Sequence, residues 1–204
     1  MGLSDRCGTA LPRAEALRRA IVNECRARGC HGVLADFDAP RCTGRLAFLE
    51  RLARSLSAQG MTLYCPLALP AEGAALLVGT AVSGGSLRAL LEETICRYSA
   101  QRLALDLERV QMDFLLPCAT GRGTPLTHKE LLTLQKQHPA SVYYSRELMA
   151  KYFTYTAEDG THFVLFDDVE TLHRKVRLAQ SLGIREAFVM YPEVADILPE
   201  LGRW

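Results

Sequence analysis

Residues 32–38 read Gly-Val-Leu-Ala-Asp-Phe-Asp, a short apolar run that ends in two carboxylates. A buried strand of a parallel sheet has this pattern, because it is apolar where it crosses the core and polar where it emerges. Residues 12–28 precede it and carry an apolar residue at nearly every helical turn, with arginines between them. The stretch therefore predicts a helix that leads into a buried parallel strand.

The same alternation continues along the chain. Further strands are expected at residues 61–65, 75–81, 102–108 and 187–191, with helical patterns between them. The Asp159-Gly160 pair predicts a hairpin, Thr127 and Glu130 match a capping box, and Asp168 is expected to cap the last long helix. Strands that alternate with helices imply βαβ crossovers and hence an α/β fold with a mainly parallel sheet or barrel.

Length and composition narrow the class of protein. The chain has 204 residues and an apolar fraction of 49%, which fit a single α/β domain over residues 1–204. Its formal net charge of +1 favours neither nucleic acid nor an anionic membrane as a partner. It has no apolar run long enough for a membrane span and no secretory signal pattern. The seven cysteines include no CxxC. We therefore expect reduced thiols in a cytoplasmic protein, with no metal and no cofactor.

The first candidate site is the acidic end of the opening strand. Asp36 and Asp38 are two residues apart, so both carboxylates would face the same side of a strand. Like charges held close raise one pKa, which leaves a proton donor beside a carboxylate. The alternative is that Asp38 only forms a turn or caps the next helix.

A second acidic strand end repeats the spacing. Asp106 and Glu108 close the strand expected at residues 102–108, and Asp113 follows. These carboxylates could complete an acid/base pair or bind a cation. The alternative is a structural ion pair from Glu108 to Arg109 or Arg102.

The third feature is the glycine-rich segment 79–86, Gly-Thr-Ala-Val-Ser-Gly-Gly-Ser. Backbone N–H groups before a helix can hold an anion, but the segment lacks the lysine of a P-loop and the frame of a nucleophile elbow. A plain turn is the alternative. The five histidines show no metal-binding spacing.

Residues 31–38 resemble the fourth-strand signature of family 18 glycoside hydrolases, D-G-x-D-x-D-x-E. The tail, residues 160–168, 172–175 and 182–191, is similar to the last part of the spore-germination branch, a bacterial, sporulation-related group. The resemblance implies a (β/α)₈ TIM barrel that acts on N-acetylglucosamine-containing glycans, in chitin or peptidoglycan. It further implies a substrate-assisted mechanism, with Asp38 as acid, Asp36 orienting the acetamido group and Tyr191 near the aromatic floor.

The sequence also departs from the family. Asp38 stands where the family has glutamate, and a catalytic group misplaced by about 1 Å can cost about 10²-fold in rate. His31 and Leu34 replace the two earlier aspartates, and the strand at 75–81 lacks the family's tyrosine–aspartate pair. With residues 32–38 as the fourth strand, only about five barrel strands fit in the chain. We therefore expect an incomplete or atypical barrel.

Together these features predict a degenerate relative of the family. It would bind an N-acetylglucosamine-type glycan or a protein partner, with weak or no hydrolysis, and could form a homodimer through an exposed apolar edge. An active hydrolase using Asp38, with Glu108 supplying a second carboxylate, is one alternative; an enzyme acting on a phosphorylated small molecule is another. The candidate catalytic residues are Asp36, Asp38 and Glu108, and the candidate substrate-binding residues are Asp106, Asp113 and Tyr191.

Overall fold

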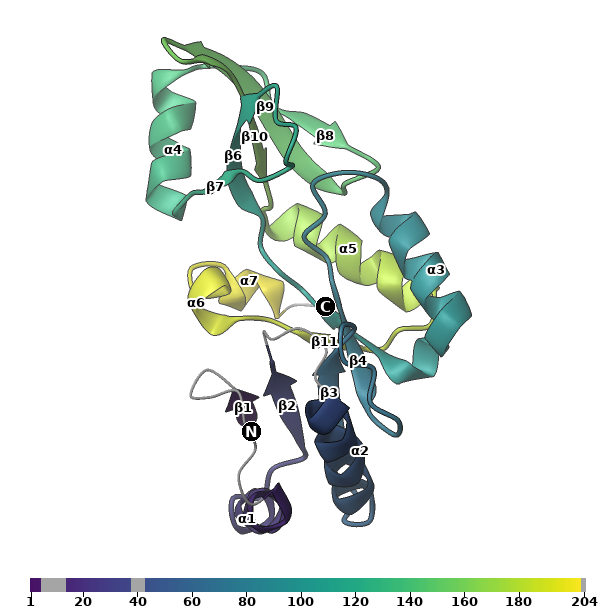
Figure 1. Ribbon diagram of the computed structural model, residues 1–204. Coiled ribbons are helices and arrows are strands. Elements are labelled where there is room, and N and C mark those ends of the chain that lie inside the picture. The colour runs from purple at the N-terminus through teal and green to yellow at the C-terminus, as the bar shows by residue number, and fades with distance from the viewer. Residues whose placement is uncertain (5–13, 38–42, 203–204) are drawn as a thin grey trace. The chain divides into compact units, whose positions relative to one another are not determined.

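The computed structural model describes residues 1–4, 14–37 and 43–202, and Figure 1 shows its elements. The first sheet holds β1 (Gly2–Ser4), β2 (Gly32–Asp36), β3 (Thr62–Pro66), β4 (Ala75–Gly79), β5 (Leu103–Asp106) and β11 (Glu186–Phe188). The second holds β6 (Gln111–Leu116), β7 (Thr124–Pro125), β8 (Tyr143–Ser145), β9 (Ala150–Ala157) and β10 (Gly160–Phe166). The helices are α1 (Ala14–Ala27), α2 (Thr43–Ser57), α3 (Leu87–Tyr98), η1 (Ala100–Arg102), α4 (His128–Gln137), α5 (Val169–Ser181), α6 (Tyr191–Val194) and α7 (Leu198–Leu201).

The strand order confirms the predicted fold class. The first sheet has the order β1-β2-β3-β4-β5-β11, and β1 to β4 pair in parallel. Helices alternate with these strands along the chain, as in a TIM-type barrel, but the sheet has six strands rather than eight. The chain is thus an α/β protein with a partial barrel topology.

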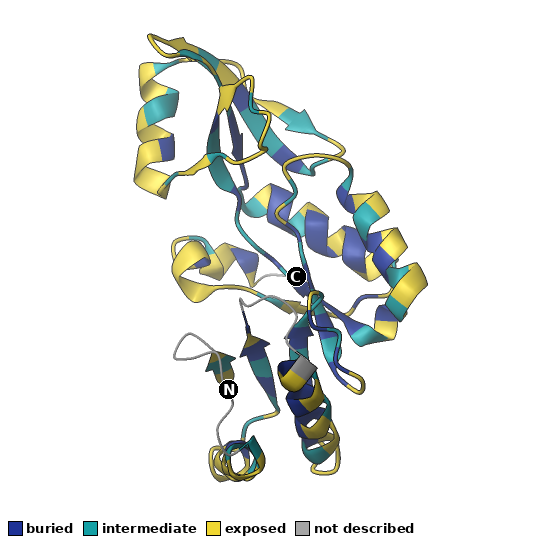
Figure 2. Cartoon of the chain, in the orientation of Figure 1, coloured by how far each residue is buried: buried dark blue, intermediate teal, exposed yellow. Residues whose placement is uncertain are grey.

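The chain divides into two compact units, residues 1–78 with 102–104 and residues 79–101 with 105–204. In the first unit the inward positions of β2, β3 and β4, among them Val33, Leu63 and Leu76, are 0–1% exposed. Leu49, Leu52 and Leu56 of α2 are fully buried. Figure 2 shows this buried layer along the strands. The sequence predicted these strands as continuous buried runs; in the structure every second residue is buried and the others are half-buried or exposed.

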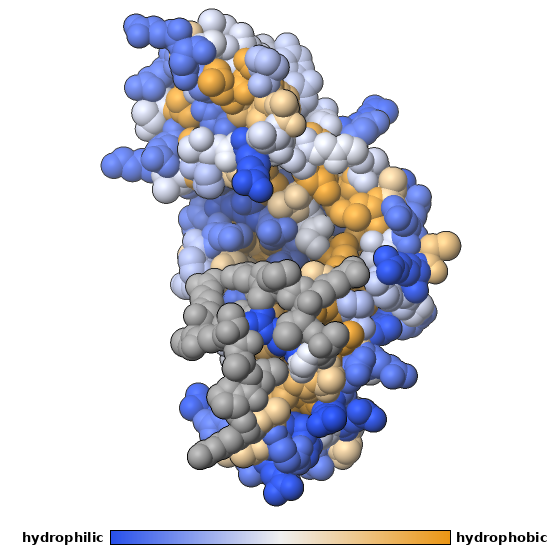
Figure 3. All heavy atoms as spheres, in the orientation of Figure 1, coloured by the Kyte–Doolittle hydropathy of each residue, from blue (hydrophilic) through white to orange (hydrophobic). Residues whose placement is uncertain are grey.

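The second unit contains an antiparallel sheet that follows β5 in the chain. Its order is β7-β6-β10-β9-β8, and β9 and β10 form the expected hairpin around Asp159-Gly160. Helix α4 begins at the predicted capping box of Thr127 and Glu130 and packs Leu131 against one face of the sheet. Figure 3 shows hydrophobic residues (orange) on the surface in the upper part of the view, where strands β6 to β10 lie in Figure 1.

Helix α5 begins as predicted. Asp168 accepts a hydrogen bond from Thr171 N, and the Thr171 side chain accepts one from Asp168 N, so the two form a capping box. Leu172, Val176 and Ala179 are buried along the helix, as their spacing predicts. No helix among the described residues is long and apolar enough to cross a membrane.

The end of the last strand differs from the prediction. A strand over residues 187–191 was expected, but β11 ends at Phe188 and Tyr191 is the first residue of α6. Pro192 follows within the first turn of that helix. A proline is well tolerated there because its ring presets a helical φ and the first turn needs no N–H donor.

Candidate functional site

A cavity of about 610 Å³ lies within the second unit. Three parts of its wall come from segments that lie after strands of the first sheet in the chain. They are residues 81–83 after β4, residues 108–110 after β5, and Pro192, Glu193 and Asp196 after β11. The other wall comes from the antiparallel sheet and the start of α4, with Gln111, Met112, Phe114, Gly121, Pro125, Leu126, Thr127 and His128. Residues that follow strands of an α/β fold are the usual lining of its ligand sites.

Glu108 is the acidic side chain that β5 brings to this cavity. Its Oε2 accepts a weak hydrogen bond from Ala81 N at 3.4 Å, and it lies against Gly79, where a Cβ would come within 2.8 Å of that oxygen. Burial and the neighbouring charge of Asp106 raise the pKa of Glu108, while the Ala81 N–H and Lys175 oppose the shift. The carboxyl group therefore keeps its proton to a higher pH than usual and can act as a hydrogen-bond donor or general acid.

Arg109 joins three walls of the cavity. Its side chain is only 5% exposed, and its Nη1 donates to Asp196 Oδ1 at 2.6 Å and to the Glu193 carbonyl oxygen at 3.0 Å. Its Nη2 lies 3.3 Å from His128 Nδ1 at the start of α4. Partial burial opposes ionisation of Asp196, but the ion pair with Arg109 outweighs it and lowers the pKa of Asp196. The cavity wall is therefore fixed by charge-assisted bonds.

Two donors beside the cavity have no hydrogen-bond partner within the described chain: Arg109 Nε and Gln111 Nε2, both buried. An unsatisfied buried donor costs about 1–3 kcal/mol. Both atoms belong to residues that line the cavity. The cavity thus combines apolar walls with a few polar groups, which is the usual chemistry of a small-molecule site.

A buried ion pair holds the backbone between these two residues. Asp167 Oδ2 accepts from Val110 N at 3.0 Å and from Lys175 Nζ at 2.6 Å, while its Oδ1 accepts from Thr171 Oγ1 at 2.8 Å. The side chains of Asp167 and Lys175 are 0% and 1% exposed. Asp167 therefore positions the segment that presents Arg109 and Gln111 to the cavity.

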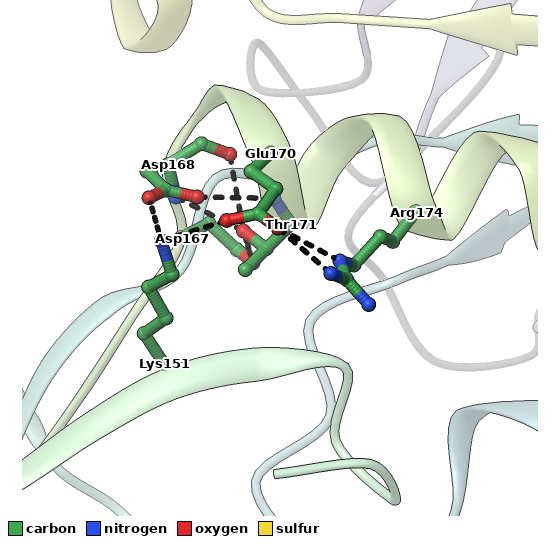
Figure 4. A network of polar contacts seen from close by, with 6 residues as sticks. All are labelled: Lys151, Asp167, Asp168, Glu170, Thr171 and Arg174. Atoms are coloured by element: carbon green, nitrogen blue, oxygen red, sulfur yellow. Dashed lines mark hydrogen bonds and ion pairs between the residues drawn. The ribbon is translucent and has the colours of Figure 1, made fainter. Parts of the chain in front are cut away.

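The polar contacts continue across the surface at the start of α5, as Figure 4 shows. Lys151 Nζ donates to Asp168 at 2.5 Å and to Glu170 at 3.1 Å, and Arg174 Nη2 donates to Glu170 at 2.7 Å. These side chains are between 25% and 56% exposed. Solvent screens such pairs, so their contribution to stability is small compared with that of the buried pair.

The predicted catalytic residues lie in different places. Glu108 lines the cavity. Asp36 is the exposed last residue of β2, in the first unit. Asp38 lies outside the described residues. The acid role that the family resemblance gives to Asp38 therefore stays a prediction.

The predicted substrate-binding residues do not line the cavity. Asp106 ends β5, half-buried, and acts on Glu108 through its charge. Asp113 lies on β6 and accepts hydrogen bonds from Tyr155 Oη at 2.7 Å and from His162 Nδ1 at 3.0 Å. Tyr191 is 66% exposed at the start of α6. These roles, too, stay predictions.

Sequence reasoning missed Arg109, Gln111 and His128 as cavity residues. Arg109 was considered only as an ion-pair partner of Glu108, whereas it pairs with Asp196. Asp196 is 87 residues further along the chain, so no local pattern connects the two.

The glycine-rich segment contributes one residue to the cavity lining beyond Ala81 and Val82: Ser83 lines the cavity, and Ser86 caps α3 by accepting from Ala89 N at 3.4 Å. Within residues 1–4, 14–37 and 43–202, no group of three His, Cys, Asp or Glu side chains could hold a metal ion.

Comparison with known sequences gives no relative: no protein-family model and no curated protein matches the chain. Solved structures do match. The spore cortex-lytic enzyme SleL of Bacillus megaterium aligns with 93% of this chain and 55% of its own, at 17% identity and a TM-score of 0.68. A chitinase of Chromobacterium violaceum aligns with 92% of this chain and 73% of its own, at 17% identity and a TM-score of 0.68.

A mutant form of the class V chitinase of Nicotiana tobaccum, solved in complex with NAG4, aligns with 98% of this chain and 80% of its own. The identity is 12% and the TM-score 0.69. The chain thus spans between about half and four fifths of the length of these three structures. The likeness confirms the resemblance to family 18 glycoside hydrolases at the level of the fold.

Proposed function

We propose that the chain binds an N-acetylglucosamine-type glycan in the cavity around Glu108, with weak or no hydrolysis. The observation that carries the proposal is the cavity of about 610 Å³ with the Glu108 carboxyl group, whose pKa is raised by burial, in its wall. Its volume falls in the usual range of small-ligand pockets, roughly 300–1,000 Å³. A structural neighbour, the Nicotiana tobaccum chitinase, is known in complex with NAG4, which supports a glycan as the ligand.

The polar groups of the cavity suit a neutral ligand rich in oxygen. Three carboxylic side chains line it, Glu108, Glu193 and Asp196, and Arg109 already pairs with one of them. An anionic ligand would meet repulsion from the remaining acidic groups. Sugar hydroxyls and amide oxygens can accept from Gln111 and Arg109 and donate to the carboxylates.

Weak or no hydrolysis is expected because β4 supplies no carboxylate to this cavity. Its last residues read Leu-Leu-Val-Gly, and Gly79 lies directly beside Glu108. In the substrate-assisted scheme that the family resemblance implies, the acetamido group of the substrate is the nucleophile, and the tyrosine–aspartate pair that the family has on this strand is missing here. Burial and the charge of Asp106 raise the pKa of Glu108, but Asp106 itself does not line the cavity.

Calorimetric titration of the full chain with a tetramer of N-acetylglucosamine tests the proposal. We expect saturable binding that Ser83→Trp abolishes, because Ser83 is exposed at the cavity and a tryptophan there would fill it. Ser57→Trp, at an exposed position of α2 outside the cavity lining, is the matched control and should bind as the unsubstituted chain does. Absence of binding, or equal binding by Ser83→Trp, would rule the proposal out.

An active hydrolase is the second candidate function. The raised pKa of Glu108 favours it, because a general acid must hold its proton near the working pH. It predicts release of shorter sugars from the tetramer and loss of that release in Glu108→Gln. Product analysis of the same titration samples separates the two functions.

A further inference from the structure

The turn that ends helix α1 has a cysteine on each side. The backbone N–H of Cys30 donates to the carbonyl oxygen of Cys25 at 2.9 Å, and that of Gly29 donates to the carbonyl oxygen of Arg26 at 3.2 Å. Gly29 has a φ of 63°, the left-handed conformation that such a turn needs at this position. The two hydrogen bonds form a Schellman motif, in which the residues at the positions of Cys25 and Cys30 often make an apolar contact. Here both of these residues are thiols.

The two sulfur atoms are near each other. The Cys25 and Cys30 thiols share a hydrogen bond. The backbone hydrogen bond between the same residues, combined with ordinary backbone bond lengths, keeps their Cα atoms less than about 7 Å apart. Disulfides form at Cα separations up to about 7 Å without movement of the backbone. The turn therefore holds the two cysteines within reach of a disulfide bond.

The two thiols differ in their access to solvent. Cys25 is 0% exposed, whereas Cys30 is half-buried in the segment that enters β2. Burial raises the pKa of the Cys25 thiol, and the neighbouring Cys30 raises it further. Disulfide exchange needs a thiolate that the reagent can reach. Cys30 is therefore the thiol that meets a reagent first, and Cys25 is the second thiol beside it.

We propose that Cys25 and Cys30 form a reversible redox site that reacts with small disulfides such as oxidised glutathione. The Cys30 thiolate attacks one sulfur of the small disulfide, which gives a mixed disulfide and releases one small thiolate. The Cys25 thiolate then attacks Cys30 Sγ and releases the other small thiolate. The protein thiols lose two electrons and two protons, and the small disulfide takes up both to become two thiols. The new bond links the last turn of α1 to the segment that enters β2.

The alternative is that the two thiols serve only as small apolar side chains that pack in the turn. This role needs no reaction with a disulfide, so a chemical test separates it from the proposal. Both cysteines lie in the first unit, whereas the cavity lies in the second. The test is therefore independent of the proposed function.

Peptide mapping of the full chain tests the inference. The reduced, folded chain is equilibrated with reduced and oxidised glutathione, quenched with acid, alkylated and digested with trypsin. Trypsin cleaves after Arg26 and Arg28, so a bond between Cys25 and Cys30 joins peptide 20–26 to peptide 29–41. We expect this linked pair as the main oxidised product, and its loss on treatment with dithiothreitol.

Two variants complete the mapping. Cys30→Ser, at a half-buried position, should give no linked pair. Cys96→Ser, at an exposed position of α3 in the other unit, is the matched control and should give the same yield as the unsubstituted chain. Glutathione bound at Cys30 without formation of the linked pair would overturn the inference and leave the apolar contact as the role of the two thiols.

A second comparison separates the effect of the fold from that of the short spacing, because cysteines five positions apart also meet in an unfolded chain. The same equilibration is therefore run in concentrated urea. We expect the equilibrium constant for the linked pair to be about tenfold higher in the folded chain, since a disulfide that fits the native geometry favours the folded state. An equal or lower constant in the folded chain would overturn the inference. A predominant bond to Cys7 or Cys42, which lie outside the described residues and on separate tryptic peptides, would overturn it as well.

Discussion

Replacing Lys175 by methionine should strongly destabilise the second unit. Lys175 Nζ lies 2.6 Å from Asp167 Oδ2, and both side chains are at most 1% exposed. The substitution keeps the apolar stem but leaves the Asp167 carboxylate buried, with only the Val110 N–H and the Thr171 hydroxyl as donors. Breaking a buried pair in this way costs about 3–5 kcal/mol, a large part of a typical stability of about 5–15 kcal/mol.

Removing both charges should cost less than the sum of the single changes. In the double variant Asp167→Leu with Lys175→Met no buried charge remains, and the main loss is the partner of the Val110 N–H, about 1–3 kcal/mol. The two single changes should therefore be strongly coupled, because each alone leaves an uncompensated charge. Urea unfolding of the four proteins measures this coupling.

Lys151→Met is the matched control. Lys151 pairs with Asp168 and Glu170 but is 25% exposed, so its loss should cost at most about 1 kcal/mol. A cost below about 1 kcal/mol for Lys175→Met, or strict additivity in the double variant, would refute the reasoning. It would mean that water reaches the Asp167 carboxylate.

Three further expectations concern titration and helix capping. Burial and Asp106 raise the pKa of Glu108, so the folded chain binds that proton more tightly than the unfolded chain. The free energy of unfolding should therefore fall as pH rises through the raised pKa. Urea unfolding of Glu108→Gln at the same pH values should lack this fall. Hydrogen bonds to Asp159 and Asp113 outweigh partial burial and raise the pKa of His162 above 6.5. Its stabilisation should therefore be complete at low pH and be lost as pH rises through the raised pKa of the folded chain. An NMR titration that gives a pKa at or below 6.5 would contradict this. Thr127→Ala removes the cap of α4 and should lower the stability of that helix by about 1 kcal/mol. Amide exchange in α4 should become faster, and unchanged exchange would argue against the capping box.

Local patterns were enough to predict the parallel strands and the helix starts. The apolar run of residues 32–36 forms β2, and the capping boxes at Thr127 and Asp168 start α4 and α5. Each of these features depends on neighbours within a few residues. For the same reason the hairpin at Asp159-Gly160 was predictable.

The antiparallel sheet and the cavity were harder to predict. Strand β6 reads Gln-Met-Asp-Phe-Leu-Leu. Its Phe114 packs with Leu165 in a buried cluster, and its Asp113 accepts hydrogen bonds from Tyr155 and His162, so the environment of both side chains is set by strands β9 and β10. The contact of Arg109 with Asp196 joins residues that are 87 positions apart. Such contacts follow from the tertiary fold, and a single sequence carries no local signal for them.

Binding of a glycan beside Glu108 is most directly tested by a crystal structure of the full chain soaked with a tetramer of N-acetylglucosamine. We predict an intact sugar chain in the cavity, with an oxygen within hydrogen-bond distance of Glu108 and of Arg109 or Gln111. A cavity that stays free of sugar at saturating tetramer, or a sugar bound only elsewhere on the chain, would contradict the account.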